Sequence, residues 1–186
     1  MLPLFLKVIE TMRLVFFDYN KNIVDAMIKI ISMIQFEKSK LKRFNINPIF
    51  EYVQCDVRKL KNKVDIFVSP ANSYGYMDGG IDEIYSKMFK GIGEAVRIKN
   101  KQMNIKNVRG QYILPIGSAT VVNIPNPDEH VRSKLLICAP TMKLPCNITG
   151  TRNVYYAMLA ILRLAHGFSY ETVVGIPGLG TGVGGL

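Results

Sequence analysis

The sequence lacks the residues that mark several large classes of protein. Its 186 residues include only three cysteines, which form no CxxC pair, and only two histidines. These counts exclude a disulfide framework, a zinc motif and a histidine-rich metal site, and they favour a reducing compartment. No apolar run approaches the roughly 20 residues that a membrane-spanning helix needs. The N-terminus has no basic region and no small-residue cleavage site, so we predict an intracellular protein, cytoplasmic or nuclear, with no membrane partner.

Apolar and basic residues are abundant instead. Hydrophobic residues make up 48% of the chain and charged residues 20%, which is typical of a globular protein. The length favours one domain. We interpret residues 1–12 as an N-terminal extension and residues 13–186 as that domain. The 24 Lys and Arg against 14 Asp and Glu give a net charge of +10, which predicts an anionic partner: a nucleic acid, a nucleotide, a phospholipid or an acidic protein.

Segments typical of strands alternate with segments typical of helices, without a linker or repeat. After Asn20, which is expected to cap it, a first helix of about 16 residues carries apolar residues on one face; these are Ile23, Met27, Ile30, Ile31 and Ile34. Further helices are predicted at residues 81–99 and 151–166. Strands are predicted at residues 13–18, 49–57, 64–68, 112–114, 119–123, 134–139 and 171–176. The alternation predicts a three-layer α/β/α domain with a mixed, mostly parallel sheet.

Two glycine-rich loops, residues 69–81 and 177–185, each follow a predicted buried strand. In parallel α/β folds ligands bind beyond the carboxyl ends of the strands. Successive amides of the second loop form a nest for phosphate oxygens, and the first loop leads into a helix N-terminus, which also binds anions. Two facing anion sites suit a pyrophosphate, although both loops could instead be tight surface turns. Neither is a P-loop, and no GxGxxG follows the first strand.

Three segments, in order, resemble the macro domain family, which binds ADP-ribose. Residues 54–57 (Gln-Cys-Asp-Val) are similar to the family's Gly-Asp-Ile strand end. Residues 69–82, from Ser-Pro-Ala-Asn to Gly-Gly-Ile-Asp, are similar to its Asn-Ala-Ala-Asn…Gly-Gly-Val-Asp loop. Residues 177–185 are similar to its Pro-Ala-Ile-Ser-Thr-Gly-Ile-Tyr-Gly loop. The resemblance covers about residues 13–186 and includes residues 134–140, which look like the family's strand ending in Ala-x-x-Pro.

The resemblance implies a role for each matching residue. Asp56 would accept a hydrogen bond from the adenine amino group, and the Val57 amide would contact the adenine or the α-phosphate. Asn72 would hold the distal ribose hydroxyls; the alternative is that it only stabilises a turn. The diphosphate would lie between two sets of backbone groups, those of Gly79, Gly80 and Ile81 on one side and those of Gly180, Thr181, Gly182 and Val183 on the other.

Asp82 separates an enzyme from a binding module. It lies ten residues after Asn72, the spacing of the hydrolytic MacroD-like branch, so the resemblance implies that Asn72 and Asp82 are catalytic. Asp82 would activate a water that releases mono-ADP-ribose from protein carboxylates or hydrolyses ADP-ribose-1″-phosphate, without a metal or cofactor. The alternatives are a non-catalytic reader of ADP-ribose, in which Asp82 only stabilises the helix dipole, and a nucleic-acid-binding protein.

Partners follow from these functions. The resemblance implies ADP-ribose or an ADP-ribosylated protein, and the net charge of +10 adds RNA or poly-ADP-ribose. Residues 99–106 are basic but lack the interleaved aromatics that are typical of single-strand binding, which weakens the nucleic-acid hypothesis. The sequence predicts no oligomeric state.

The sequence also departs from the family's pattern. Gly184 stands where the family usually has an aromatic residue beside the distal ribose, and Tyr74, Tyr76 or Tyr85 could compensate for it. Ser86 stands where hydrolytic members often carry a histidine. Met77 and Asp78 replace two glycines, and Asp78 is expected to point outward. Cys55 is expected to be a buried apolar thiol. The chain ends at Leu186, before the family's usual C-terminal helix, which predicts either a truncated domain or one that is covered there by a partner or by the N-terminal segment.

Overall fold

The computed structural model of the protein describes residues 13–36, 49–127, 131–169 and 171–186. The predicted extension at residues 1–12 lies outside these ranges. Within α1 the backbone of Ile31 and Ile34 is described, but their side chains are not. Within them the chain forms, in order, β1 (Arg13–Asp18), α1 (Lys21–Phe36), β2 (Ile49–Gln54), the 3₁₀ helix η3 (Val57–Leu60), β3 (Ile66–Ser69), α3 (Gly80–Met88), α4 (Ile92–Met103), β4 (Thr120–Asn123), β5 (Leu135–Cys138), α5 (Asn153–Ala165) and β6 (Val173–Pro177).

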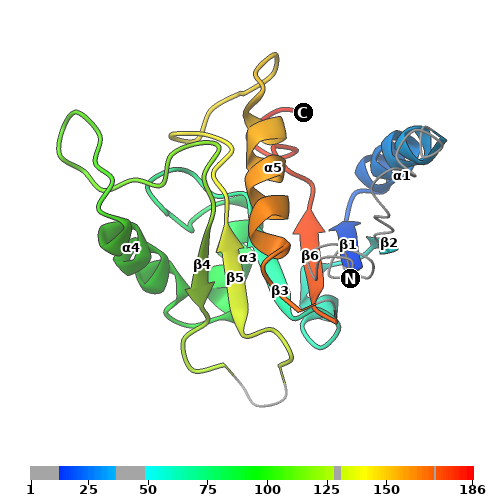
Figure 1. Cartoon of the computed structure of the whole chain (residues 1–186), viewed down its shortest axis with the longest axis horizontal. Coiled ribbons are helices and arrows are strands. Elements are labelled where there is room, and N and C mark those ends of the chain that lie inside the picture. Colours follow the sequence, from blue (N-terminus) through cyan, green and yellow to red (C-terminus); the bar gives the residue numbers. More distant parts are fainter. Residues whose placement is uncertain (1–12, 37–48, 128–130, 170) are drawn as a thin grey trace, which may run out of the picture.

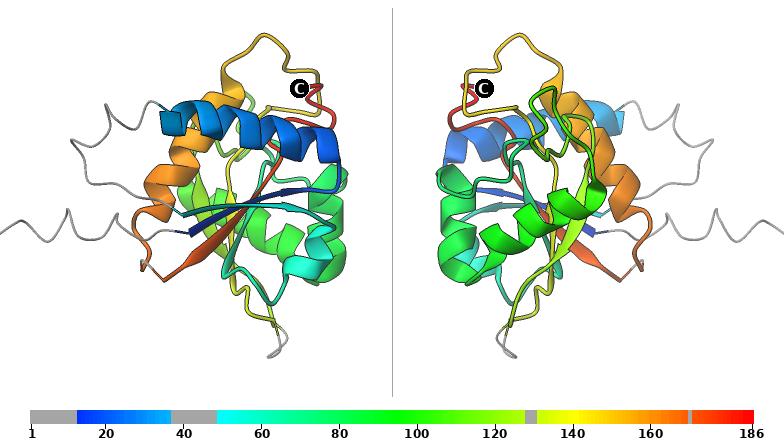
Figure 2. Two further views of the ribbon diagram at one scale, coloured as in Figure 1. Left: turned by 90° about the vertical axis from the view of Figure 1, so that its right-hand side faces the viewer. Right: turned by 90° about the vertical axis from the view of Figure 1, so that its left-hand side faces the viewer.

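The six described strands form one mixed sheet in the order β2-β1-β6-β3-β5-β4 (Figure 1). All neighbouring strands run parallel except β4, which is antiparallel to β5. Helices α5 and α3 lie on opposite sides of the sheet (Figure 2). The prediction of an α/β/α fold with a mostly parallel sheet is therefore confirmed.

Each face of the sheet has its own apolar core because successive side chains of a strand point to opposite faces. Phe67 on β3 packs with Tyr85 and Phe89, which come from the α3 side. Its neighbours Ile66 and Val68 pack in the cluster that contains Ile161 of α5. All three β3 residues are fully buried, as expected for a central parallel strand.

Three details of the predicted elements are wrong. The helix expected over residues 81–99 is two helices: α3 ends at Met88, where Phe89 leaves the helical conformation, and Gly91, in a left-handed conformation (φ +85°), precedes the start of α4. The segment 112–114 is no strand; Tyr112 makes only an isolated bridge with Lys106. The second strand ends at Gln54, and Val57 begins the 3₁₀ helix because the Asp56 carboxylate caps it by accepting from the Arg58 amide.

The predicted length of the first helix, α1, agrees with the structure, but its predicted buried face agrees only in part. Asn20 caps it as expected, since its side chain accepts a hydrogen bond from the amide of Asn22. Met27 packs against the apolar core, but Ile30 is 58% exposed. No helix of the described residues is long and apolar enough to cross a membrane.

Candidate functional site

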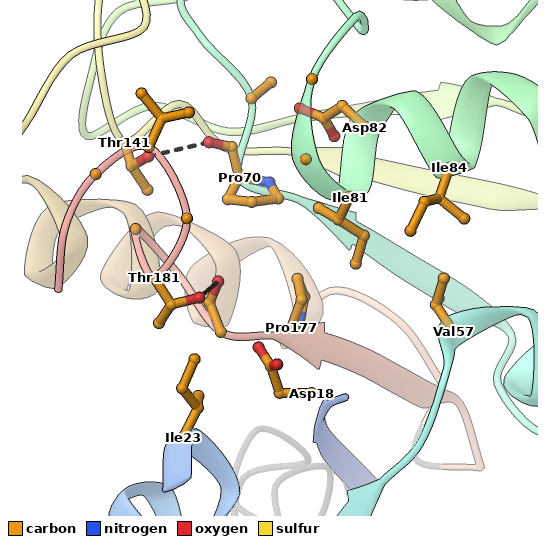
Figure 3. A pocket seen from close by; sticks show the side chains of 18 of the residues that line it. Asp18, Ile23, Val57, Pro70, Ile81, Asp82, Ile84, Thr141, Pro177 and Thr181 are labelled. Carbon is orange, nitrogen blue, oxygen red and sulfur yellow. Dashed lines mark hydrogen bonds between the residues drawn. The ribbon is translucent and has the colours of Figure 1, made fainter. Parts of the chain in front are cut away.

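A cavity of about 410 Å³ lies beyond the carboxyl ends of β1, β6 and β3 (Figure 3). Five segments line it: the β1–α1 turn, residues 55–57, the loop and helix start between residues 70 and 84, the loop at residues 141–145, and residues 177–184. Parallel strands place their carboxyl ends at one edge of the sheet, which brings the two glycine-rich loops together. The cavity is therefore where the sequence predicted a ligand.

Every residue that the sequence assigned to the site lines this cavity: Asp56, Val57, Asn72, Gly79, Gly80, Ile81, Asp82, Gly180, Thr181, Gly182 and Val183. Their individual roles stay predictions. The sequence missed the β1–α1 turn and the segment around Thr141 and Met142, which also line the cavity. These segments carry no motif, and only the position of the turn after a buried parallel strand could have pointed to the first of them.

Two sets of backbone amides on the cavity lining have no protein acceptor. Helix α3 begins after Gly79, which offers no side-chain cap, and within the described chain the amides of Gly80, Ile81 and Asp82 donate to no protein group. The same holds for the amides of Thr181, Gly182 and Val183 in the loop after β6. Unpaired amides at a helix N-terminus and in a glycine-rich loop are what bind phosphate oxygens in proteins.

The loop after β6 is held in a compact shape by its own backbone. The Leu186 amide donates to the Gly180 carbonyl at 3.1 Å, and the Gly185 amide donates to the Gly182 carbonyl at 3.0 Å. Gly184 is buried in this loop, and a Cβ there would lie 2.4 Å from the Gly180 oxygen. The aromatic residue that the family usually has at this place therefore does not fit this loop conformation.

Asp82 is a buried carboxyl at the start of α3. It is 6% exposed, and its Oδ1 accepts a hydrogen bond from the Ser69 hydroxyl at 2.6 Å. Burial raises the pKa of Asp82 to about 7, and the nearby charge of Asp78 adds to this effect. Its Oδ2 has no hydrogen-bond partner within the described chain. A carboxyl that is half ionised near neutral pH is suited to exchange a proton with a reacting group.

The side chain of Asn72 forms its hydrogen bonds within its own loop. Its Oδ1 accepts from the amides of Tyr74 and Tyr76 at 3.1 and 3.2 Å, and its Nδ2 donates to the Tyr76 carbonyl at 2.9 Å. This is the turn-stabilising role that the sequence left open as an alternative. One Nδ2 hydrogen remains for a ligand.

Asp56 is held by a neighbour. Its carboxylate accepts from the Arg58 amide at 2.9 Å and from Nε of the same residue at 2.8 Å, and it forms an ion pair with the guanidinium. These hydrogen bonds lower the pKa of Asp56 to about 2. The group is consequently an anionic hydrogen-bond acceptor at every physiological pH.

The departures from the family's pattern have local structural explanations. Ser86 donates to the carbonyl oxygens of Met77 and Asp82 at 2.6 and 3.0 Å, which ties α3 to the loop before it. Met77 belongs to the apolar core. Asp78 is exposed but also lines the cavity, although it was expected to point away from a ligand. Cys55 was expected to be buried but is only partly so, because it lines the cavity.

The three tyrosines named as replacements for the missing aromatic differ in position. Tyr85 does not reach the cavity lining, because it is fully buried and its hydroxyl donates to the Val68 carbonyl at 3.1 Å. Tyr76 lines the cavity and stacks on Tyr74, with ring centroids 5.8 Å apart. Of these three tyrosines, Tyr76 is therefore the one that lines the cavity.

The charged side chains of the cavity lining are all acidic within the described part of the chain. Asp18, Asp56, Asp78 and Asp82 line it, and no described Lys or Arg does. The described residues contain no cluster of three or more His, Cys, Asp or Glu arranged to hold a metal ion. The described Lys and Arg therefore lie away from this lining, and among the described residues an anionic ligand would be held by backbone amides.

Comparison with known proteins adds to this geometry. No family model matches the sequence. An uncharacterized protein of Aquifex aeolicus is 30% identical over 136 residues, which are 70% of this chain and 73% of that protein. The macrodomain of Mycobacterium tuberculosis DarG has a TM-score of 0.55 at 22% identity, covering 73% of this chain and 79% of that one. This chain has the macrodomain fold.

A second solved structure agrees with this assignment. Thermosipho africanus DarTG in complex with ADP-ribose has a TM-score of 0.56 at 15% identity. The match covers 80% of this macrodomain and 43% of the Thermosipho chain, so the present chain spans less than half of that protein. The macrodomain resemblance that the sequence suggested is thus confirmed at the level of the fold. By its identity and coverage, the chain also belongs to one family with the Aquifex protein.

Proposed function

We propose that this macrodomain binds ADP-ribose. The observation that carries the proposal is that two sets of amides without a protein acceptor, at the start of α3 and in the loop after β6, belong to residues that line one cavity. A diphosphate between them would accept hydrogen bonds from both sides. The proposal is further supported by the shared fold with Thermosipho africanus DarTG, whose solved structure contains ADP-ribose.

The ends of the cavity suit the two ends of this ligand. At one end, the anionic Asp56 offers an acceptor for the adenine amino group, and Val57 and Ile23 provide apolar contacts for the ring. At the other end, Asn72 and Tyr76 would face the distal ribose. Neutral backbone amides bind phosphate oxygens without a positively charged side chain, so this mode of binding needs no Lys or Arg on the lining.

Calorimetric titration of ADP-ribose, with AMP and ADP as controls, tests this proposal. We expect ADP-ribose to bind more tightly than either control, because only it reaches both ends of the cavity. Substitution Gly182→Val should weaken binding without lowering the melting temperature, because a Cβ at this lining position meets no protein atom within 4 Å. Equal affinity for ADP-ribose and AMP would contradict the proposal.

A second function, hydrolysis of an ADP-ribosyl bond, is favoured by the geometry of Asp82. With Oδ1 occupied by Ser69, the unpartnered Oδ2 would accept a proton from water while the water oxygen bonds to C1″ of the distal ribose. The bond from C1″ to the protein carboxylate, or to the phosphate of ADP-ribose-1″-phosphate, would break, and the leaving group would depart as an anion. A non-catalytic reader would have the same cavity without this turnover.

Substitution Asp82→Ala distinguishes the two. An enzyme loses its rate of release from a glutamate-linked mono-ADP-ribosyl peptide, while its affinity for free ADP-ribose changes little. A reader shows no release with either protein. If the Asp82→Ala variant releases ADP-ribose at the wild-type rate, Asp82 has no role in the mechanism.

A further inference from the structure

One long stretch of the chain carries positive charge without negative charge. From residue 95 to residue 127 there is no Asp or Glu, whereas Arg97, Lys99, Lys101, Lys106 and Arg109 all fall within it. Within the described chain, only Arg97 of these five has an ion pair, with Glu94 at 2.6 Å. None of the other four has an acidic partner within the described chain.

Two of these charges lie on a well-defined hairpin after α4. Lys106 and Tyr112 pair as an antiparallel bridge, and the Lys106 ammonium lies 4.7 Å from the centroid of the Tyr112 ring. The side-chain oxygen Oδ1 of Asn107 accepts hydrogen bonds from the amides of Arg109 and Gln111 at 2.9 and 3.0 Å, which closes the turn. Such a turn holds its tip in a fixed position.

The tip itself is apolar and fully exposed. Val108 has its whole side chain in solvent, at 102% relative exposure, and it stands between Asn107 and Arg109. A single exposed valine is ordinary, but this one has a basic residue on each side of it in the sequence: Lys106 two positions before and Arg109 one position after. An aliphatic side chain between two cations suits a polypeptide that has both acidic and apolar residues.

A continuous set of contacts connects this hairpin to the cavity. Asn107 Nδ2 donates to the Tyr74 hydroxyl at 3.0 Å, and Tyr74 stacks on Tyr76, which lines the cavity. The loop carrying both tyrosines packs on α4, where Asn100 donates to the Ser73 carbonyl at 3.4 Å. In Figure 1 the hairpin extends from the end of α4, at the end of the sheet where the cavity-lining loops lie.

We propose that Tyr74, Tyr76, Lys106, Val108 and Arg109 form a docking surface for the acidic polypeptide that carries the ADP-ribosyl group. This inference rests on the proposed function, which places the distal ribose beside Tyr76 and hence the carrier outside it. A carboxylate that carries the modification belongs to a Glu or Asp, and acidic neighbours in its sequence would meet the basic hairpin.

A nucleic-acid carrier fits this surface less well. Bases bind single-strand proteins by stacking on free aromatic faces. Tyr74 and Tyr76 each cover one face of the other, and the Lys106 ammonium covers a face of Tyr112. The exposed aliphatic tip at Val108 offers no stacking surface.

The test compares two hydrolysis-resistant mono-ADP-ribosyl peptides that differ only in their flanks, acidic in one and Gln and Asn in the other. At low salt we expect the wild-type protein to bind the acidic peptide about tenfold more tightly than the neutral one or free ADP-ribose. The double variant Lys106→Gln/Arg109→Gln should lose most of this advantage and bind free ADP-ribose as before. Raising the salt concentration should have the same effect.

A matched control removes two charges elsewhere. Lys29 and Arg163 are exposed, lie on α1 and α5, and have no ion pair within the described chain. The variant Lys29→Gln/Arg163→Gln should keep the preference for the acidic peptide. Equal binding of the two peptides by the wild type, or a preference that survives in the hairpin variant, would overturn the docking surface. A single-stranded oligonucleotide that displaces the acidic peptide in a hairpin-dependent manner would do the same.

Failure of the proposed function has a different signature. If the wild type does not bind free ADP-ribose, the cavity assignment fails, and the hairpin is then tested with the unmodified acidic peptide at millimolar concentration. Shifts of the backbone amide resonances confined to residues 104–112 and their neighbours would support the surface. Their absence would overturn it.

Discussion

Gly184 packs so closely against Gly180 that a Cβ at position 184 would lie 2.4 Å from the Gly180 carbonyl oxygen and 2.9 Å from its Cα. Both neighbouring atoms belong to the backbone, so no side chain can turn aside to relieve the contact. The loop after β6 therefore has its shape only with glycine at this position.

Substitution Gly184→Ala should consequently displace the loop that carries half of the unpaired amides. We expect the free energy of unfolding to fall by about 1–3 kcal/mol and ADP-ribose affinity to fall with it. Gly182→Ala is the matched control, since its Cβ meets no atom within 4 Å and its φ is not positive. Thermal unfolding and calorimetry measure both effects; similar melting temperatures for the two variants would contradict the explanation.

Asp82 makes the stability of the protein depend on pH. Its pKa rises from 3.8 to about 7 on folding because burial disfavours the charged form. The folded state therefore binds more protons than the unfolded state between these values, so the free energy of unfolding falls as pH rises from about 4 to about 7 and then levels off. Asp82→Asn should abolish this trend and raise stability at pH 8 by up to about 4 kcal/mol. Urea denaturation at pH 5 and pH 8 measures it, and an unchanged pH dependence in the variant would contradict it.

Asp56 should distinguish nucleotides by their base. Its carboxylate stays ionised because hydrogen bonds from Arg58 hold its pKa at about 2, so we expect no change in adenine recognition between pH 5 and pH 9 from this group. Asp56→Ala should weaken ADP-ribose binding roughly tenfold, the usual loss for one hydrogen bond to a charged acceptor. Ribose-5-phosphate has no adenine and serves as the control ligand. An equal loss for both ligands would mean that Asp56 shapes the site and does not contact the base.

Gly75 should be required for the position of the tyrosine pair. It has φ +75°, and a Cβ there would lie 2.7 Å from Cγ1 of Val96 on α4. We expect Gly75→Ala to reduce stability by about 1–3 kcal/mol from backbone strain and steric contact together. Adding Val96→Ala should relieve only the steric part, so a double-mutant cycle would show a favourable coupling between the two positions. Strictly additive losses would contradict the proposed contact.

The strands and the site loops could be predicted from the sequence because their signals are local. The apolar run of β3 and the glycines after β6 pointed to the two site loops, and the resemblance to the macro domain family singled out Asn72, Asp82 and Gly180, all of which line one cavity. These features depend on residues that are close together in the chain, where pattern and turn chemistry act directly.

The remaining features depended on contacts between distant segments. The sequence favoured one helix over residues 81–99 because the apolar pattern continues through Gly91, and only the structure shows the break between Met88 and Ile92. The sequence made Tyr85 a candidate for the cavity, but in the structure its hydroxyl donates a hydrogen bond to the Val68 carbonyl in the core. The basic residues 99–106 contain no interleaved aromatic residue, but the fold brings Tyr112 to Lys106 and Tyr74 to the adjacent Asn107.

The central place of β6 has a consequence for how the protein is made. Residues 173–177 pair with residues 13–17 on one side and with β3 on the other, although β6 is the last described strand to be synthesised. Until it leaves the ribosome, β1–β2 and β3–β5–β4 are two separate half-sheets with open edges, which invite pairing with other chains. Joining them closes a loop of most of the chain length, and such non-local pairing makes folding slow. We therefore expect the nascent protein to remain aggregation-prone until its glycine-rich loop is complete, so that the sheet and the ligand site form in the same late step.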